Sequence, residues 1–260
     1  MNANLSIVIA TFNSDKTLKK TLESLVNQTY KSFEVIIVDG LSNDNTVTII
    51  KEYEKKFLEA RIPCFWSSEK DSGIYDAWNK ALEKVNTSWI AFLGSDDTYY
   101  QNALEIYNNS IAKNQSINYI SSKVELIDRN DKVLKVIGKP YKYKQMNRYM
   151  DIAHVGSFHH KDIFKKHGNF NLNYKVVADY DFFLRCGNDI RAAYINEVTT
   201  KMLNTGVSNQ NVTQVFKEVL KVHLTHKKIS RLQAYFEYLY NHIRIHISLL
   251  IGKTRFKTRF

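Results

Sequence analysis

Short apolar runs alternate with amphipathic segments over the first hundred residues, and this alternation restricts the chain to few folds. Runs rich in β-forming residues predict strands at 5–10, 33–38, 62–66 and 89–93. Apolar residues at helical spacing predict helices over 16–28, 47–57 and 74–85. Such a series usually builds a parallel sheet with right-handed crossovers. The sequence therefore predicts an α/β fold with a mostly parallel sheet flanked by helices.

Polar side chains follow each of the predicted strands. In open sheets of this kind, ligands lie beyond the carboxyl ends of the strands. The polar residues found there are Thr11, Asn13, Asp39, Glu69, Asp71, Asp96 and Asp97. We expect these side chains to converge on one edge of the sheet.

The adjacent acids Asp96 and Asp97 end an apolar run that begins at Trp89. Two carboxylates so close together repel each other, and such pairs are rarely left without a neutralising cation. Their hard oxygen atoms suit Mg²⁺ or Mn²⁺, which commonly bridges protein carboxylates to substrate phosphates. The alternative is that both acids only form a turn or cap a helix. The pattern by itself leaves both interpretations open.

The sequence lacks the glycine-rich loops of the common nucleotide-binding folds. The segment 10–13 (ATFN) stands where a dinucleotide-binding fold has G-x-G-x-x-G, and no G-x-x-x-x-G-K-[ST] is present. These absences argue against a dinucleotide-binding Rossmann domain and a P-loop NTPase. A nucleotide site in this sheet would need a metal ion to hold the diphosphate.

Composition sets the remaining limits. A chain of 260 residues with 44% hydrophobic and 24% charged residues is typical of one globular domain with an appendage. The cysteines Cys64 and Cys186 lie far apart, which predicts neither a disulfide framework nor a zinc site. No signal peptide is recognisable, and no apolar run approaches the about 18 residues of a membrane span. We therefore expect a cytoplasmic location.

Four motifs, taken in order, carry a resemblance to a known family. They are Ser6–Asn13 (SIVIATFN), Glu34–Gly40 (EVIIVDG), Glu69–Lys80 (EKDSGIYDAWNK) and Gly94–Asp97 (GSDD). Each motif is weak alone, but the ordered set resembles family 2 glycosyltransferases, which are inverting enzymes of the GT-A fold. The chain is most similar to bacterial enzymes that build O-antigen and exopolysaccharide repeat units. The resemblance covers about residues 5–208.

The resemblance implies a nucleotide-sugar-binding half over residues 1–100 and an acceptor-binding half over 101–208. By this resemblance, the nucleotide of a UDP-sugar is flanked by Thr11 and Asn13. Asp39 would accept a hydrogen bond from the base or the ribose, and Asp71 would face the nucleotide sugar. Two structural alternatives stay open: Asp39 as a turn former, and Asp71 as the cap of the helix at 74–85.

The segment 95–97 resembles the family's Asp-x-Asp-like metal element, with serine in its first place. This match implies that Asp97 is the metal ligand and that Asp96 contacts the ribose or the sugar. The ion, Mn²⁺ or Mg²⁺, would offset the charge that builds on the departing UDP.

The second half of the chain resembles the acceptor side of these enzymes. The segment Ala178–Arg185 (ADYDFFLR) matches an element of the Glu-Asp-Tyr-Asp kind, with Ala178 in place of the glutamate. The match implies that Asp179 is the general base for an inverting displacement, which forms a β-glycoside from an α-linked donor. The alternative is that Asp179 and Asp181 only favour a helix N-terminus; we expect Asp181 to form a salt bridge or a cap.

Two further predictions concern the same half. His154 is predicted to contact the acceptor or the diphosphate, while His159 and His160 should point to opposite faces of a strand and stay unassigned. Residues 206–208 resemble a flexible loop near the UDP, which we expect to close over the donor.

The segment 209–260 is predicted to be a basic, amphipathic helical appendage. Residues 221–260 contain nine Lys or Arg and one acid, and so hold most of the net charge of +11. Apolar residues recur at helical spacing at 232, 236, 239, 243, 247 and 250. Such a helix suits an anionic membrane surface. The alternative is that the apolar stripe packs on the catalytic domain; nucleic-acid binding is not expected, because no recognisable module is present.

The combined prediction is a metal-dependent inverting glycosyltransferase on the inner face of the bacterial cytoplasmic membrane. Its donor would be a UDP-hexose, glucose or galactose before others, and its acceptor a sugar linked to undecaprenyl diphosphate. One alternative is an N-acetylhexosaminyltransferase of the same fold. Another is a non-catalytic relative that binds carbohydrate or membrane. A nucleotidyltransferase would need a glycine-rich, basic N-terminal loop, which is absent.

Overall fold

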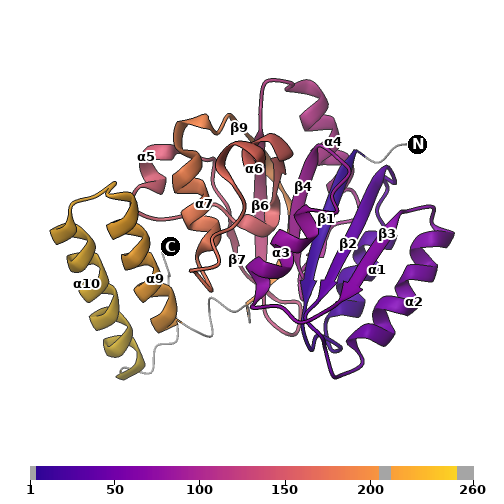
Figure 1. Cartoon of the computed structure of the whole chain (residues 1–260), viewed down its shortest axis with the longest axis horizontal. Coiled ribbons are helices and arrows are strands. Elements are labelled where there is room, and N and C mark those ends of the chain that lie inside the picture. Colours follow the sequence, from indigo (N-terminus) through magenta and orange to yellow (C-terminus); the bar gives the residue numbers. More distant parts are fainter. Residues whose placement is uncertain (1–3, 205–211, 251–260) are drawn as a thin grey trace.

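The computed structural model describes residues 4–204 and 212–250, with side chains as far as Arg244. Within these residues one mixed sheet of nine strands is flanked by helices (Figure 1). The strands are β1 (Leu5–Thr11), β2 (Phe33–Asp39), β3 (Cys64–Ser68), β4 (Trp89–Gly94), β5 (Thr98–Tyr99), β6 (Tyr119–Ile127), β7 (Val133–Ile137), β8 (Ser157–His160) and β9 (Ala192–Leu203). The predicted loop at 206–208 lies outside the described residues.

Helices connect and cover these strands. They are α1 (Leu18–Val26), α2 (Thr46–Glu59), α3 (Ile74–Leu82), α4 (Ala103–Lys113), α5 (Tyr143–Met146), α6 (Lys161–His167), α7 (Ala178–Cys186), α9 (Val212–His226) and α10 (Arg231–Leu250), with short 3₁₀ helices η1 (His154–Gly156) and η2 (Gly187–Asp189). The predicted α/β fold is confirmed. β3 begins two residues later than predicted, because Arg61 has a positive φ of 58° and the N–H of Ile62 still bonds the end of α2.

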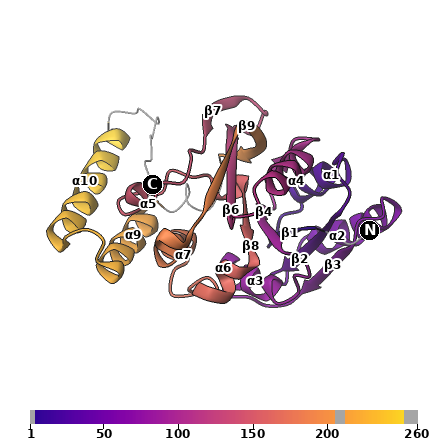
Figure 2. The same cartoon turned by 90° about the horizontal axis from the view of Figure 1, so that it is seen from above.

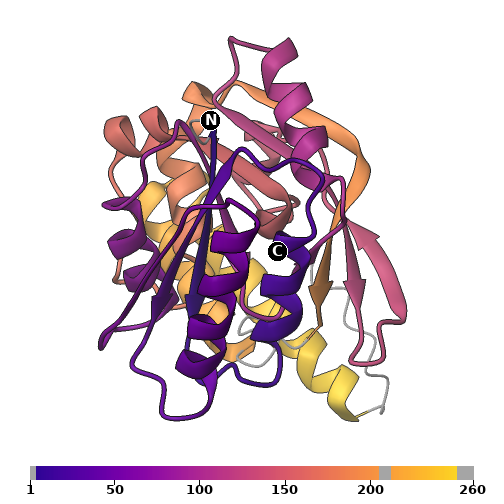
Figure 3. The same ribbon diagram turned by 90° about the vertical axis from the view of Figure 1, so that its right-hand side faces the viewer.

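The first four strands are parallel, in the order β3-β2-β1-β4. Figure 3 views this sheet from its β3 edge. Beyond β4 the sheet becomes mixed, because β8 pairs antiparallel with both β4 and β6 while β9 runs parallel to β6. In the parallel part Thr11 is opposite Asp39, and Ala10 is opposite Gly94. This register brings the carboxyl ends of β1, β2 and β4 to one edge, as predicted.

Residues of the buried strands alternate between two cores on opposite faces of the sheet. Ile7 and Ile9 face one core with α1, α2 and α4, whereas Val8 faces the other with α3, α6 and α7. Figure 2 shows α1 and α4 on one side of the sheet and α3 and α6 on the other. Burial on both faces explains why these strands are almost wholly apolar.

The two C-terminal helices differ in how they meet the rest of the protein. Val215 and Val222 of α9 belong to the second core, so α9 packs into the catalytic half although it lies in the predicted appendage. α10 packs against α9, where the ring centroids of Phe216 and His242 lie 5.7 Å apart, and forms one end of the molecule, with α2 at the opposite end (Figures 1 and 2).

The apolar stripe of α10 faces away from the domain. Its described members are Leu232, Phe236, Leu239 and Ile243, which are 56–83% exposed. The alternative that this stripe packs on the catalytic domain is therefore wrong for these residues. No helix among the described residues is long and apolar enough to cross a bilayer.

This difference predicts unequal effects of truncating an apolar side chain in α9 and in α10. Val222→Ala should lower the free energy of unfolding by about 2 kcal/mol, because Val222 is fully buried. Leu239→Ala should change it by less than about 0.5 kcal/mol, because Leu239 is exposed. Urea unfolding followed by circular dichroism measures both, and equal losses would contradict the described packing.

Candidate active site

The carboxyl ends of β1 and β4 open into a cleft of ≈ 2510 Å³ that reaches α7, α9 and α10. Most of the predicted site residues line it, namely Thr11, Asn13, Asp71, Asp96, Asp97, His154 and Asp179. Asp39 is the exception, because it lies below the surface with no exposed area. The structure thus brings residues from the predicted donor and acceptor halves to one cavity.

Asp96 and Asp97 converge above the last residue of β4. A Cβ atom on Gly94 would lie 2.5 Å from Asp97 Oδ2 and 3.0 Å from Asp96 Oδ1, so both carboxylates occupy space that any other residue would fill. Asp97 Oδ1 accepts a hydrogen bond from the Leu203 N–H at 3.0 Å. Burial raises the pKa of both carboxyls, and the charge of Asp96 raises the pKa of Asp97 further.

This arrangement fits a divalent cation. Asp96 and Asp97 direct hard oxygen atoms to one place, and their raised pKa values show negative charge with too little compensation. The described residues contain no cluster of three or more acidic, histidine or cysteine ligands. An ion held here would therefore take most of its ligands from a diphosphate and water, as Mg²⁺ and Mn²⁺ often do.

Ser95, which replaces the first acid of the family's metal element, joins two strand ends. Its hydroxyl lies 3.0 Å from the hydroxyl of Ser14, in the loop after β1. The sequence departure thus supplies a hydrogen bond between the loops after β1 and β4.

Asp39 is held entirely by serines. Its Oδ1 accepts from the Ser42 hydroxyl at 2.5 Å, and its Oδ2 accepts from the Ser68 hydroxyl at 2.6 Å and the Ser42 N–H at 3.0 Å. These bonds tie the loop after β2 to β3. A base or ribose would reach Asp39 only if the Ser42 side chain turned away, so the predicted contact with the nucleotide stays a prediction.

The loop after β1 presents groups of three kinds. Asn13 has a left-handed φ of 48°, and its Oδ1 accepts from the Asn43 N–H at 3.0 Å, which links the loops after β1 and β2. The buried hydroxyl of Thr11 has no hydrogen-bond partner among the described residues. Phe12 is 61% exposed in the cleft, although no role was predicted for it. Its position as an aromatic residue directly after β1 is the sequence signal that could have indicated a role in the site.

Asp71 lines the cleft, and the residue that caps α3 is Gly73, so the predicted contact of Asp71 with the nucleotide sugar stays a prediction. Its Oδ1 accepts from the Gly73 N–H at 2.9 Å, just before α3. Its Oδ2 lies where a Cβ atom on Gly40 would approach to 2.7 Å, beside the end of β2. The local bond to the start of α3 therefore leaves the carboxylate facing the cleft.

Asp179 lies in the first turn of α7 with one oxygen held and one free. Its Oδ1 accepts from the Tyr75 hydroxyl at 3.0 Å and from the Tyr180 N–H at 2.9 Å. No donor among the described residues contacts Oδ2. Burial and the nearby charge of Asp179 raise the pKa of Tyr75 well above its usual value, so Tyr75 remains a hydrogen-bond donor. Sequence reasoning missed this tyrosine, although it lies inside the motif at 69–80.

Asp181 has a structural role, as expected, and so does Asn79. Asp181 is buried and pairs with Arg185 Nε at 3.0 Å and His226 Nε2 at 2.8 Å. Asn79 exchanges two hydrogen bonds with the backbone of Phe170.

His154 lies between aromatic rings at the wall of the cleft. It stacks on Trp78 and Phe92, with ring centroids 5.3 and 5.6 Å away. Burial lowers its pKa, which favours the neutral imidazole, and its Nε2 has no partner within the described part of the chain. His159 and His160 point to opposite faces, as predicted: His159 is fully buried, whereas His160 packs on Trp89.

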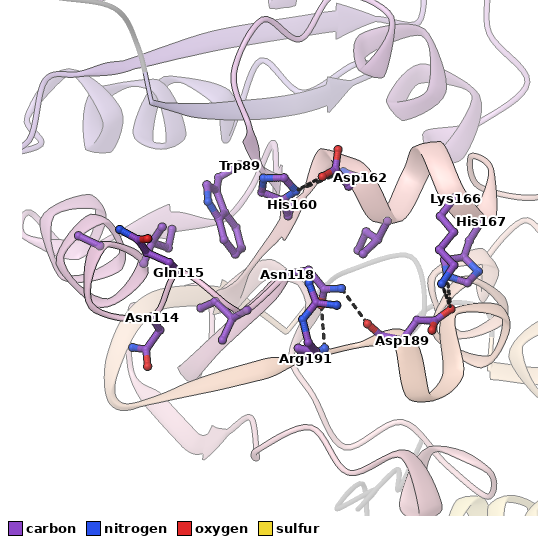
Figure 4. A pocket seen from close by; sticks show the side chains of 14 residues that line it. Trp89, Asn114, Gln115, Asn118, His160, Asp162, Lys166, His167, Asp189 and Arg191 are labelled. Carbon is purple, nitrogen blue, oxygen red and sulfur yellow. Dashed lines mark hydrogen bonds and ion pairs between the residues drawn. The ribbon is translucent and has the colours of Figure 1, made fainter.

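A second, smaller hollow of ≈ 480 Å³ lies at the other end of β4 (Figure 4). Its acids are already paired, since Asp162 contacts His160 at 3.3 Å and Asp189 contacts Lys166 at 2.7 Å. None of the predicted site residues lines it, so the large cleft is the candidate active site.

Comparison with known proteins defines the class of this fold and site. A model of glycosyl transferase family 2 matches residues 6–174. The chain therefore belongs to this family, and its fold is the GT-A fold of such enzymes.

Particular relatives add detail. A PGL/p-HBAD biosynthesis glycosyltransferase of Mycobacterium bovis is 30% identical over 83% of this chain and 82% of its own. A UDP-Glc:α-D-GlcNAc-diphosphoundecaprenol β-1,3-glucosyltransferase of Escherichia coli is 32% identical over 51% of this chain and 50% of its own. A mannosyltransferase of Pyrobaculum calidifontis, solved with GDP-Man and Mn²⁺, has a similar fold, with a TM-score of 0.67, 13% identity, and coverage of 92% of this chain and 70% of that one.

The buried acid pair makes a prediction about stability. Because the folded-state pKa of Asp97 is raised, its stabilising contribution is complete at low pH and is lost as the pH rises through that pKa. Asp97→Asn keeps an oxygen for the Leu203 N–H and removes the charge. At pH 7 without metal it should raise Tm by a few degrees, at about 2–4 °C per kcal/mol for a protein of this size.

The same thermal scans are repeated with added metal. With UDP present in every sample, Mn²⁺ should raise the Tm of the wild type and of the exposed control Asp162→Asn, but not that of Asp97→Asn. The difference between wild type and Asp97→Asn without metal should shrink towards pH 4. A variant that is less stable at pH 7, or that still responds to Mn²⁺, would refute the metal-site assignment.

Proposed function

We propose that this protein is an inverting glycosyltransferase that moves a hexose from a UDP-sugar to a sugar on a lipid diphosphate, with a β-glycosidic product. The proposal rests on one observation: Asp179, whose Oδ2 accepts no hydrogen bond from the described residues, lies in the same cleft as the paired acids Asp96 and Asp97. The E. coli relative, named as a UDP-Glc:α-D-GlcNAc-diphosphoundecaprenol glucosyltransferase, supports the same donor and acceptor classes.

Asp179 is the proposed base. Its free Oδ2 would take the proton from an acceptor hydroxyl while that oxygen bonds to the anomeric carbon and the bond to UDP breaks. The Tyr75 hydroxyl and the Tyr180 N–H hold Oδ1, which fixes the direction of Oδ2. His154, neutral and unpaired at Nε2, is available to contact the acceptor or the diphosphate.

The donor is proposed to lie over the ends of β1 and β4. The Thr11 hydroxyl offers an unsatisfied polar group, and the exposed Phe12 ring offers a face on which a base can stack. Asp97 would hold Mn²⁺ or Mg²⁺, with Asp96 beside the ribose or sugar. A bound ion would stabilise the negative charge on the leaving diphosphate.

We further propose that α10 meets the anionic inner face of the cytoplasmic membrane. Its exposed apolar residues are Leu232, Phe236, Leu239, Tyr240 and Ile243. Exposed basic side chains lie at Arg231, the first residue of α10, and at Lys227 and Lys228 in the turn before it. Each basic group near an anionic surface adds about 1 kcal/mol of attraction. The protein would encounter a lipid-linked acceptor at this membrane surface.

The base assignment predicts the outcome of one substitution. Asp179→Asn keeps both contacts to Oδ1 but removes the proton acceptor, so acceptor-dependent UDP release should fall by at least about 100-fold. The affinity for UDP with Mn²⁺ should change little. The assay uses a panel of UDP-glucose, UDP-galactose and UDP-N-acetylhexosamines with a synthetic undecaprenyl-diphosphate monosaccharide.

The panel also separates the alternatives. Turnover with only N-acetylhexosamines would replace the hexose proposal, and no turnover by folded wild type would favour a non-catalytic binding protein. Full activity of Asp179→Asn would show that another group is the base.

The membrane proposal predicts selective binding to vesicles. The wild type should co-sediment with vesicles that contain 30% anionic phospholipid and bind much less to neutral ones. Leu239→Glu should weaken this binding by about tenfold, because it places charge in the apolar stripe. Leu58→Glu is the matched control, since Leu58 is 78% exposed on α2 at the opposite end of the molecule. Equal binding by both variants would exclude α10 as the contact.

A further inference from the structure

A buried carboxylate of α9 holds the segment that precedes α7. Glu218 Oε1 accepts from the Lys175 N–H at 2.9 Å, and its Oε2 accepts from the N–H groups of Val176 and Val177 at 2.9 and 3.2 Å. Gln214 Nε2 donates to Oε1 at 2.8 Å. Glu218 is 4% exposed, and no cationic side chain among the described residues forms an ion pair with it. Its charge is therefore satisfied by backbone and amide N–H groups alone.

These N–H groups stand directly before a helix, where backbone donors lack partners within the helix. Hydrogen bonds to an ionised acceptor are about twice as strong as neutral ones, so one carboxylate fixes three consecutive residues. A purely apolar contact would fill the same space without the cost of burying a charge. The carboxylate, unlike an apolar side chain, fixes the orientation of the 175–177 backbone.

That backbone also holds the proposed base. The Tyr75 hydroxyl lies 2.9 Å from the Val176 carbonyl and 3.0 Å from Asp179 Oδ1, and these two acceptors share its single proton. Lys175 Nζ donates to the Ser72 carbonyl at 3.0 Å, which ties the segment to the loop that carries Asp71. Glu218 and Asp179 are thus linked through two intermediates, the 175–177 backbone and the Tyr75 side chain.

We infer that Glu218 is a positioning residue for the transfer reaction: it fixes residues 175–177 and thereby the orientation of Asp179 in the cleft. The inference rests on the proposed role of Asp179 as the base. It assigns part of the active-site geometry to α9, which lies beyond the residues 6–174 that match the family model.

The test compares Glu218→Gln with Lys217→Ala, a control at an exposed position on the same helix. Glu218→Gln has nearly the same volume but replaces one acceptor oxygen by an amide donor. Either Val176 and Val177 or Lys175 and Gln214 then lose their acceptor, depending on how the amide is oriented. A displacement of about 1 Å can cost 100-fold in rate. With the donor that turns over in the UDP-sugar panel, we expect kcat to fall 10- to 100-fold. KM for the donor and Kd for UDP with Mn²⁺ should change less than twofold.

A second readout does not depend on turnover. Hydrogen–deuterium exchange of peptides that cover 175–177 should become faster in Glu218→Gln and stay unchanged in Lys217→Ala, with exchange in β1 and β4 unaltered. Unchanged kcat, or a loss of kcat that only matches a loss of folded protein, would overturn the inference. If Glu218→Gln does not fold, Gln214→Ala decides: kcat should fall two- to fivefold with donor KM unchanged, and no fall would overturn the inference.

Asp179→Asn, measured in parallel, keeps the two questions apart. An active Asp179→Asn would defeat the base assignment itself. An inactive Asp179→Asn together with a fully active Glu218→Gln would defeat only the positioning role.

Discussion

The parallel register of β1, β2 and β4 is the constraint on which the site depends. Thr11 lies opposite Asp39 and Ala10 lies opposite Gly94, so three loops leave the sheet at the same edge. A shift of one residue would turn every side chain of a strand to the other face, and the two apolar cores forbid this. Core packing therefore determines where the polar loop residues meet.

The buried acids of this protein differ in what compensates their charge. Asp181 contacts the Arg185 guanidinium and the His226 ring, and Asp39 has three donors from two serines. Asp97 has the single Leu203 N–H and a second carboxylate beside it. The first two acids are compensated and have structural roles, whereas the deficit at Asp97 supports the proposal that a cation binds there.

Helices beside the sheet supply the proposed base and the groups that hold it. The helix α7 carries Asp179 to the cleft, α3 provides Tyr75, and α9 fixes the backbone between them through Glu218. The same α9 supports α10, whose apolar face is exposed. The proposed catalytic geometry and the proposed membrane contact therefore share one supporting helix.

The sequence by itself determined the α/β alternation, the strand ends and the family, because apolar periodicity and ordered motifs are local properties of the chain. It also placed Asp97 and Asp179 among the candidates. Only the tertiary structure decided that Asp39 is enclosed by serines, that Tyr75 contacts Asp179 across 104 positions, and that the α10 stripe faces outwards. These facts depend on which distant side chains compensate a charge or cover an apolar face, and no local pattern records such partners.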